Sequence, residues 1–349
     1  MFDGYKDIKM SKNFIIFAGY KSIHFMKRFL FVIAVVLTFA GQATGRDNYR
    51  LLYWNIQNGM WDGQGDNYAR FLGWVKDKNP DICVWCEAQP IYKTDSSEKL
   101  DDIESWRTDA PLIAFWKGLA KKYGHKYVFL SGHRDNYPQI ITSRFPIDSV
   151  ARIVGSKADT LVAHGAGWAR IKLGKDTVNL VSVHTWPHKH GHGVAKKDRE
   201  KSAKAHGGDI FRVTEMEYIC KHTILGADPD GKGLWMMMGD FNSITSRENW
   251  VYHKDKDNPA FLVHNYINEN TPYIDVIAER EPNNFHSSTP GRRRIDYIYA
   301  TPPMFGKIKA ANVIFDDYTR QQKAMKDGER ISIFHRPSDH LPIIVDFSL

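Results

Sequence analysis

The sequence predicts an α/β fold for this chain of 349 residues. Short apolar runs of strand length alternate with segments of helical spacing, and several runs are apolar throughout, as in strands buried on both faces of a sheet. Polar motifs follow or begin most of these runs, so their side chains can converge on one rim of a sheet. The motifs are Trp54-Asn55, Glu87, His184-Thr185-Trp186-Pro187, Gly239-Asp240-Phe241-Asn242, Arg294-Ile295-Asp296-Tyr297 and Ser338-Asp339-His340.

The first 45 residues are expected to lie outside this fold. Met26-Lys27-Arg28 precedes an apolar run over 29–40, and small residues follow at 41–45. This pattern is typical of a secretory signal peptide and is too short to span a bilayer, although a buried core helix is the alternative. We therefore expect translation to start at Met26, residues 1–25 to be an upstream extension, and residues 26–45 to be removed. The mature protein is then secreted or periplasmic, with no stable membrane span.

Charge and cysteine content set further bounds. Residues 1–45 hold six Lys or Arg and two Asp, so their removal lowers the net charge from +8 to +4. That value is compatible with a polyanionic substrate without requiring one. Cys83, Cys86 and Cys220 make no disulfide framework, and the first two lie inside an apolar strand, so we expect buried core residues and no zinc site.

The elements of the first half follow from local patterns. Strands are expected at 50–56, 82–85, 127–130 and 139–142, where apolar residues are continuous. A helix at 67–77 has apolar residues at Phe71, Leu72 and Val75, and Asn79-Pro80-Asp81 ends it. A second amphipathic helix is expected at 111–123.

The second half continues in the same way. Strands at 167–173 and 177–184 form a hairpin around Gly174-Lys175-Asp176, and 195–224 is mostly helix with a break near Gly207-Gly208. Further strands are expected at 234–238, 295–300 and 341–347. No linker or repeat divides the chain, so we expect a single domain over 46–349.

The six motifs, in their order and spacing, resemble those of the endonuclease/exonuclease/phosphatase superfamily, in particular a deoxyribonuclease-I-like, secreted bacterial-type member. The resemblance runs from about Leu51 to the C-terminus. It implies a four-layer α/β sandwich, with two mixed β-sheets packed face to face and helices outside. It also implies Mg²⁺- or Mn²⁺-dependent cleavage of a phosphate ester.

A metal site is expected around Glu87. Mg²⁺ prefers oxygen ligands and usually needs one or two protein carboxylates, although a Glu at a strand end can also be merely solvated. By resemblance, Asn55 orients the metal shell or the phosphate, and Asp339 reaches toward the metal. Some relatives have an Asp where this chain has Gln57, which puts a second metal site in doubt.

The catalytic residues are expected to be His184, Asp240, Asn242, Asp296 and His340. Asp240 can align or deprotonate a water, and Asn242, on the same side by strand alternation, can donate to a phosphate oxygen; an Asx turn is the structural alternative. By resemblance, His184 donates to the phosphate or leaving group. An Asp296 carboxylate on one nitrogen of His340 would fix its tautomer. Whether Asp240 or His340 is the general base stays open.

Substrate contacts are expected from Trp186 and Arg294. The run Arg292-Arg293-Arg294 is interpreted as partly a solvated surface and partly a contact to phosphate. His188, His190 and His192 alternate in a Gly-containing segment that precedes Lys196, Lys197 and Arg199. We interpret this segment as a solvated loop rather than a metal site.

Together these features predict a metal-dependent phosphoric ester hydrolase, with a phosphodiesterase or nuclease using in-line attack of an activated water as the leading interpretation. The substrate is then a phosphate ester, with nucleic acid as a candidate, and the protein is expected to be a monomer. The alternative is a phosphatase or phosphodiesterase acting on lipid headgroups, inositol or sugar phosphates. A non-catalytic binding module on the same fold ranks last.

Overall fold

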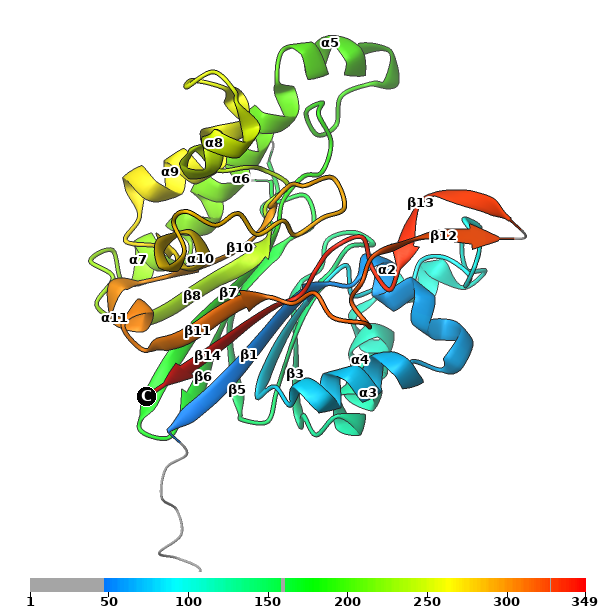
Figure 1. The fold of residues 1–349 in the computed structure, drawn as a ribbon, viewed down its shortest axis with the longest axis horizontal. Helices are drawn as coiled ribbons and strands as arrows, with labels where there is room; N and C mark the ends of the chain where they lie inside the picture. The colour runs from blue at the N-terminus through cyan, green and yellow to red at the C-terminus, as the bar shows by residue number, and fades with distance from the viewer. Residues whose placement is uncertain (1–46, 158–160, 327) are drawn as a thin grey trace, which may run out of the picture. The chain divides into compact units, whose positions relative to one another are not determined.

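Two mixed β-sheets of six strands each lie face to face in the computed structural model (Figure 1). The structure describes residues 47–349 apart from 158–160 and 327, so the predicted extension and signal peptide fall outside the described residues. Asp47–Leu349 folds as one unit. Among the described residues, no helix is long and apolar enough to cross a membrane.

The first sheet has the order β11-β14-β1-β2-β4-β3, with β1 and β2 parallel and the other pairs antiparallel. Its strands are β1 (Asn48–Asn55), β2 (Ile82–Cys86), β3 (Tyr127–Gly132), β4 (Gln139–Ser143), β11 (Ile308–Val313) and β14 (Ile343–Ser348).

The second sheet has the order β5-β6-β7-β8-β10-β9, with β7 and β8 parallel and the other pairs antiparallel. Its strands are β5 (Ile147–Ile153), β6 (Ala166–Leu173), β7 (Asp176–His184), β8 (Leu234–Asp240), β9 (Ile274–Asp275) and β10 (Asp296–Ala300). A separate hairpin consists of β12 (Gln322–Lys326) and β13 (Glu329–Arg336).

Helices occupy the connections between the strands. The α-helices are α2 (Gln57–Met60), α3 (Ala69–Lys78), α4 (Asp109–Lys122), α5 (Arg199–Lys204), α6 (Gly207–Lys221), α7 (Ile224–Ala227), α8 (Asn249–Tyr252), α9 (Leu262–Asn270), α10 (Val276–Arg280) and α11 (Pro302–Phe305). Short 3₁₀ helices are η1 (Trp61–Asp66), η2 (Ile103–Arg107), η3 (Lys196–Asp198), η4 (Ser246–Glu248) and η5 (Pro259–Phe261).

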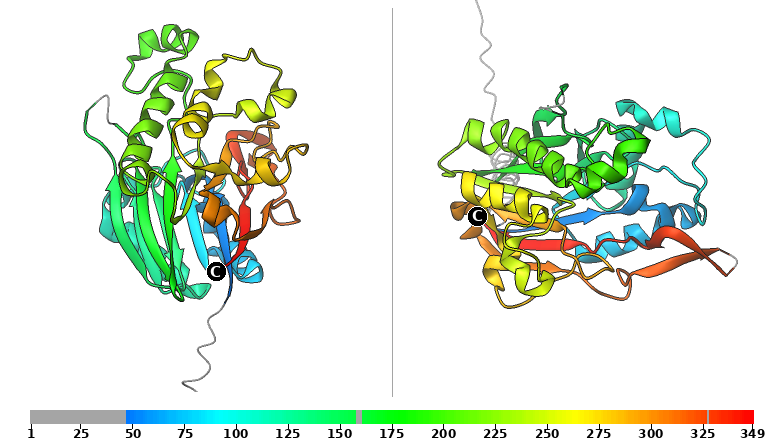
Figure 2. Two further views of the ribbon diagram at one scale, coloured as in Figure 1. Left: turned by 90° about the vertical axis from the view of Figure 1, so that its left-hand side faces the viewer. Right: turned by 90° about the horizontal axis from the view of Figure 1, so that it is seen from above.

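Strand alternation produces four layers, as predicted. In β1, Tyr53 points into an apolar core between the two sheets, and Trp54 points outward into a second core under α3 and α4. Residues of β7, β8 and β10 alternate in the same way toward a third core under α6 and α9. Figure 2 shows these helices on the outer sides of the two sheets. The three cysteines are buried and free, as expected.

The predicted strands and helices are present, but several strands at the edges were missed. β5 and β11 each have one neighbouring strand and expose many side chains, and the β12–β13 hairpin is largely polar. Such segments lack the continuous apolar runs that identified the central strands. The predicted break near Gly207-Gly208 is confirmed, because α5 ends at Lys204 and α6 begins at Gly207.

Arg294 is a core residue, which corrects the expectation that it contacts substrate. Its side chain is fully buried, and its guanidinium donates to both oxygens of Asp275, at 3.0 and 2.6 Å, and to Glu248 at 3.0 Å. The same group lies over the ring of Tyr297, 4.1 Å from its centroid. Arg294 therefore joins β10 to β9 and η4. A substrate could reach it only by breaking a buried ion-pair network.

Replacing Arg294 should destabilise the protein far more than replacing its neighbour. Arg294→Met leaves two buried carboxylates uncompensated, which should lower the free energy of unfolding by about 3–5 kcal/mol. Arg293→Met, at an exposed site, should change it by less than about 0.5 kcal/mol. Urea denaturation of both variants measures the difference. Equal losses would contradict the structural role of Arg294.

Candidate active site

Strand register brings three of the expected catalytic residues side by side. His184 at the end of β7 pairs with Asp240 at the end of β8, and Asp240 pairs with Asp296 at the start of β10. Asn55 ends β1 in the other sheet, and its Nδ2 donates to Asp240 Oδ2 at 3.1 Å. The two sheets therefore meet at this rim through a buried polar contact.

His340 and Asp296 form a hydrogen-bonded dyad. His340 Nδ1 lies 2.7 Å from Asp296 Oδ2, and because a carboxylate only accepts, Nδ1 carries the proton. The hydroxyl of Tyr53 donates to the other oxygen of Asp296 at 2.7 Å. Ser338 Oγ accepts from the His340 backbone N–H, and Trp54 donates to the His340 carbonyl. These contacts fix the imidazole so that Nε2 faces Asp240.

Asp240 lies between two imidazoles. The Nε2 atoms of His184 and His340 are each 3.7 Å from Asp240 Oδ2, while Asp240 Oδ1 accepts the backbone N–H of Asn242 at 2.8 Å. The Asn242 side chain donates to the Thr185 carbonyl at 3.0 Å, so the predicted amide is held beside the carboxylate. All four side chains come from loops or strand ends at one rim.

The residues expected to bind metal adjoin this group. Glu87 accepts from Asn55 Nδ2 at 3.3 Å and from the backbone N–H of Asn58 at 3.0 Å. Asn55 thus bridges Glu87 and Asp240. Asp339 is partly exposed, with Oδ1 4.0 Å from His340 Nε2. The structure therefore brings Glu87, Asn55 and Asp339 to the same rim as the catalytic candidates.

The donor set fits a hard divalent cation. Ligand atoms of Asp240, Asp296 and His340 lie within 4.8 Å of one another, but both oxygens of Asp296 are already engaged by Tyr53 and His340. The carboxylates with remaining capacity are Asp240, Glu87 and Asp339. Across the described ranges, no Lys or Arg pairs with Glu87 or Asp240 within 4 Å, so a bound cation would supply the missing positive charge.

Burial and mutual repulsion shift the pKa values in this site. Burial raises the pKa of Asp240 to about 7, despite the opposing effect of His340. Burial and then the Asp339 charge raise the pKa of Glu87. Burial lowers the pKa of His340, but Asp296, Asp339 and Asp240 outweigh it and raise that pKa well above 6.5. At neutral pH His340 is therefore a cation, and Asp240 is close to its titration point.

A second His–Asp pair, which the sequence analysis did not predict, lies against the ring of His184. His164 Nδ1 lies 2.7 Å from Asp135 Oδ2, and the His164 ring is 4.3 Å from the His184 ring. Burial opposes protonation of His164, but Asp135 raises its pKa above 6.5. Burial and this neighbouring charge lower the pKa of His184, which is therefore neutral. No local spacing links residues 29 positions apart, so the sequence held no signal for this pair.

Helix α6 fixes the segment after His184, and this role was also missed. Glu215 is fully buried and accepts the backbone N–H groups of Trp186 at 2.9 Å and Ala163 at 2.7 Å. One turn earlier, Arg212 donates to the carbonyls of Trp186 and His188. Arg212 and Glu215 lie on the buried face of α6, at helical spacing from the apolar Met216 and Ile219. Two charged residues on an otherwise apolar helix face could have been detected in the sequence.

The His-rich segment is a loop with exposed residues, as expected, and its imidazoles also pack around Trp186. The imidazoles of His188 and His192 lie 4.7 and 4.8 Å from the Trp186 ring, and its indole N–H donates to the His190 carbonyl. Trp186 is therefore partly buried by its own loop. Its predicted contact with substrate stays a prediction.

Gln57 has a structural role that accounts for the departure from the family pattern. Its side-chain amide donates to the His335 carbonyl at 3.1 Å and accepts the His335 backbone N–H at 3.2 Å, while its own N–H donates to Asn55 Oδ1. The side chain thus ties β13 to the end of β1, where Asn55 lies. With both ends of its amide engaged, Gln57 offers little to a second metal ion.

The sequence matches a family model described as Endonuclease/Exonuclease/phosphatase family over residues 52–340. That match includes the whole set of candidate site residues. No curated protein sequence gives a match.

Solved structures share the fold at low sequence identity. An AP endonuclease from Archaeoglobus fulgidus has a TM-score of 0.53 and 16% identity, covering 86% of this chain and 100% of that chain. A 3′ phosphatase from Neisseria, bound to product DNA hairpin, has a TM-score of 0.52 and 16% identity, covering 86% of this chain and 100% of that chain. An endonuclease/exonuclease/phosphatase from Beutenbergia cavernae has a TM-score of 0.51 and 15% identity, covering 87% of this chain and 72% of that chain.

The raised carboxyl pKa values predict that Mg²⁺ stabilises the protein more at high pH. An acid whose pKa is raised by folding binds extra protons in the native state, so stability falls as pH rises through about 4 to 7. A cation should offset this loss. We expect Mg²⁺ to raise the melting temperature by about 2–4 °C more at pH 8 than at pH 5.5. Glu87→Gln should remove most of the difference between the Mg²⁺ effects at the two pH values. An equal Mg²⁺ effect on the melting temperature of the native protein at both pH values would contradict this prediction.

Proposed function

The chain belongs to the endonuclease/exonuclease/phosphatase family, whose members are phosphoric ester hydrolases, and we propose that it is a metal-dependent phosphodiesterase that cleaves nucleic acid. The observation that carries the proposal is the position of Asp240. One of its oxygens faces two imidazole nitrogens at 3.7 Å, and Asn55 links it to Glu87. An acid, a base and a cation site therefore surround one small space.

The cation, Mg²⁺ or Mn²⁺, would be held by Glu87 with Asn55 and Asp339, and when bound it neutralises charge on a phosphate oxygen. These residues are already ordered for that task. Asn55 and the Asn58 backbone hold Glu87 in place before any ligand arrives. Such preorganisation lowers the cost of assembling the site.

Asp240 is the better general base in this proposal. Its pKa of about 7 lets it take a proton from water near neutral pH, and Asn242 holds its other oxygen. His340 is protonated, because Asp296 raises its pKa despite burial. It therefore serves as a donor that stabilises the negative charge of the phosphorane-like transition state, while Asp296 and Tyr53 keep it oriented.

His184 donates in its neutral form. Its pKa is lowered by burial and by protonated His164, so the ring is neutral near pH 7 and keeps one N–H that can donate. Nε2 of His184 faces the same space as Nε2 of His340. We propose that these two imidazoles contact different oxygens of one phosphate, with the leaving oxygen between them.

The alternative, hydrolysis of lipid headgroups, inositol or sugar phosphates, relied on Trp54, Trp61, Trp168 and Trp186. Trp54 and Trp61 are fully buried in the core, and Trp168 packs on Trp235, which leaves only the partly buried Trp186 beside the site. The alternative of a binding module relied on Gln57, which has a structural role instead. Nucleic acid therefore remains the leading substrate. Secretion through residues 26–45 and action as a monomer are part of the proposal.

The proposal is tested with bis-p-nitrophenyl phosphate and the mature protein (residues 46–349). We expect hydrolysis with Mg²⁺ or Mn²⁺, none in EDTA, and a loss of about 10²–10⁴-fold in kcat/KM for His340→Ala. Plasmid DNA, RNA, sphingomyelin and inositol phosphates define the substrate class.

The matched control is His222→Ala, an exposed histidine that hydrogen-bonds only a helix carbonyl among the described residues. It should retain full activity. Hydrolysis confined to lipid or inositol esters would favour the alternative, and silence with every ester and metal would overturn the proposal.

A further inference from the structure

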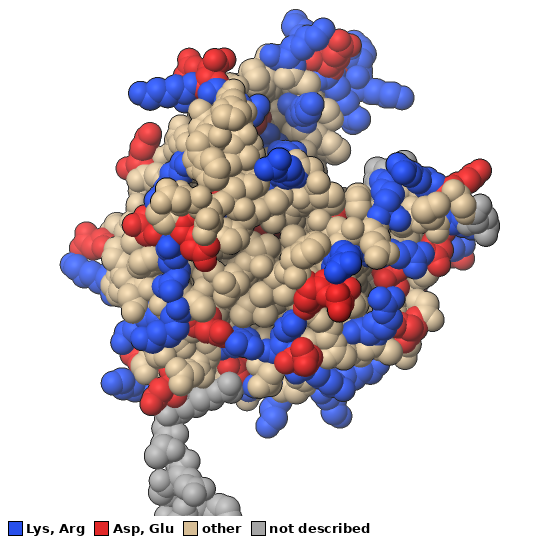
Figure 3. Space-filling model, viewed as in Figure 1, with Lys and Arg blue, Asp and Glu red and all other residues tan. Residues whose placement is uncertain are grey.

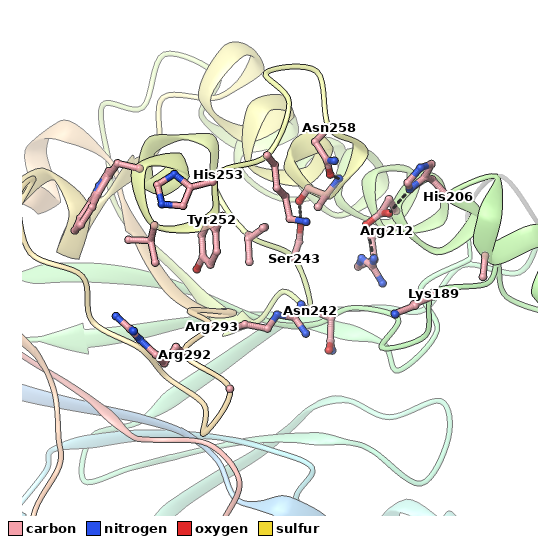
Figure 4. A pocket seen from close by; sticks show the side chains of 18 residues that line it. Lys189, His206, Arg212, Asn242, Ser243, Tyr252, His253, Asn258, Arg292 and Arg293 are labelled. Atoms are coloured by element: carbon pink, nitrogen blue, oxygen red, sulfur yellow. Dashed lines mark hydrogen bonds and ion pairs between the residues drawn. The ribbon is translucent and has the colours of Figure 1, made fainter.

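A cavity of about 980 Å³ opens beside Asn242, next to the catalytic group (Figure 4). Asn242 belongs both to the lining of the cavity and to the catalytic group, because its backbone N–H donates to Asp240. Figure 4 shows Lys189 and Arg293 on opposite sides of Asn242, both directed toward it. We call this space the Asn242 cleft.

The cleft is strongly cationic. Lys189, Lys254, Arg292 and Arg293 line it and are exposed. In the described part of the chain, none of these four forms an ion pair with a carboxylate within 4 Å. The one acid in the lining, Asp209, is already paired with Arg212 and lies 3.4 Å from His206. The unbalanced charge therefore favours an anionic ligand.

The cations are carried by well-defined backbone. Ser288 and Thr289 both donate backbone N–H groups to the Arg293 carbonyl, at 2.9 and 3.2 Å, which closes a turn. That turn exposes Arg292 and Arg293 while Arg294 is buried. Across the cleft, the Lys189 carbonyl accepts the Gly208 N–H at 2.8 Å. A Cβ on Gly208 would lie 2.0 Å from the His188 carbonyl oxygen, so only glycine allows this approach.

An aromatic surface accompanies the charges. Trp250 lines the cleft and is 51% exposed, which is unusual for so large an apolar side chain. Tyr252, also in the lining, is fixed by the Arg294 backbone N–H, which donates to its hydroxyl at 3.1 Å. Exposed aromatic rings beside cations are the features with which proteins bind single-stranded nucleic acid.

We propose that the Asn242 cleft binds the single-stranded segment of nucleic acid that flanks the scissile phosphate. Phosphates contact Lys189, Lys254, Arg292 and Arg293, and an unpaired base stacks on Trp250. The position of the scissile phosphate rests on the proposed function. Figure 3 shows more Lys and Arg on the lobe around α5 and on the β12–β13 hairpin, on either side of a hollow in the surface, and a strand leaving the cleft would pass between them.

The binding test uses fluorescein-labelled dT12 in EDTA, so that no turnover occurs, at several salt concentrations. The quadruple variant Lys189→Ala, Lys254→Ala, Arg292→Ala, Arg293→Ala should bind at least tenfold more weakly, with a salt slope smaller by about 3. The control removes four exposed lysines elsewhere: Lys117→Ala, Lys121→Ala, Lys126→Ala, Lys307→Ala. It should behave like the native protein. Equal loss in both variants, or none in the first, overturns the proposal.

The base contact is tested separately. Trp250→Ala should weaken dT12 binding about tenfold and leave binding of inorganic polyphosphate of similar length unchanged, because only dT12 has bases. Equal affinity of dT12 and polyphosphate, with no effect of Trp250→Ala, would reduce the cleft to a general polyanion site and overturn the nucleic-acid assignment. Tighter binding of a blunt duplex than of dT12 would overturn the single-strand assignment.

A small substrate separates this inference from the proposed function. The quadruple variant should lose a much larger factor of activity on oligonucleotides than on bis-p-nitrophenyl phosphate, which has no flanking nucleotides. If the ester is hydrolysed but dT12 affinity does not depend on the four cations, the cleft assignment fails alone. If the four cations control dT12 affinity but no ester is hydrolysed with any metal, the cleft assignment is supported and the catalytic proposal fails.

Discussion

The buried negative charge of Asp240 and Glu87 is the constraint on which the site depends. Neither carboxylate has a Lys or Arg partner among the described residues, so other groups must stabilise them. Asn55 donates to both, backbone N–H groups hold each one, and His340 supplies a nearby positive charge. These interactions leave the carboxylates partly unsatisfied. The remaining deficit favours a cation at the site and accompanies the raised pKa of Asp240.

The two-sheet architecture makes this arrangement possible. His184, Asp240 and Asp296 are neighbours because β7, β8 and β10 are in register, while Asn55 comes from the opposite sheet. Apolar packing between the sheets fixes their separation over most of their length. At the rim where these strands end, polar side chains meet across the gap. A rigid scaffold of this kind positions catalytic groups without needing the loops to close first.

The sequence predicted most of the site because its residues lie at the ends of apolar strands. Asn55 and Asp240 end such strands, where the strand period sets their direction, and Glu87 directly follows one. Arg294 was misassigned, since nothing local shows which of three successive arginines is buried. The His164–Asp135 pair and the link from Gln57 to His335 were inaccessible for a different reason. Both join segments far apart in sequence, and only tertiary packing brings them together.

The link between Gln57 and the β12–β13 hairpin extends the reach of the site beyond its own pocket. Trp61 stacks on Phe334 of β13 with centroids 4.7 Å apart, and Gln57 is bonded twice to the adjacent His335 and once to Asn55. The position of Asn55 therefore depends in part on a hairpin that contributes none of the candidate catalytic or metal-binding residues.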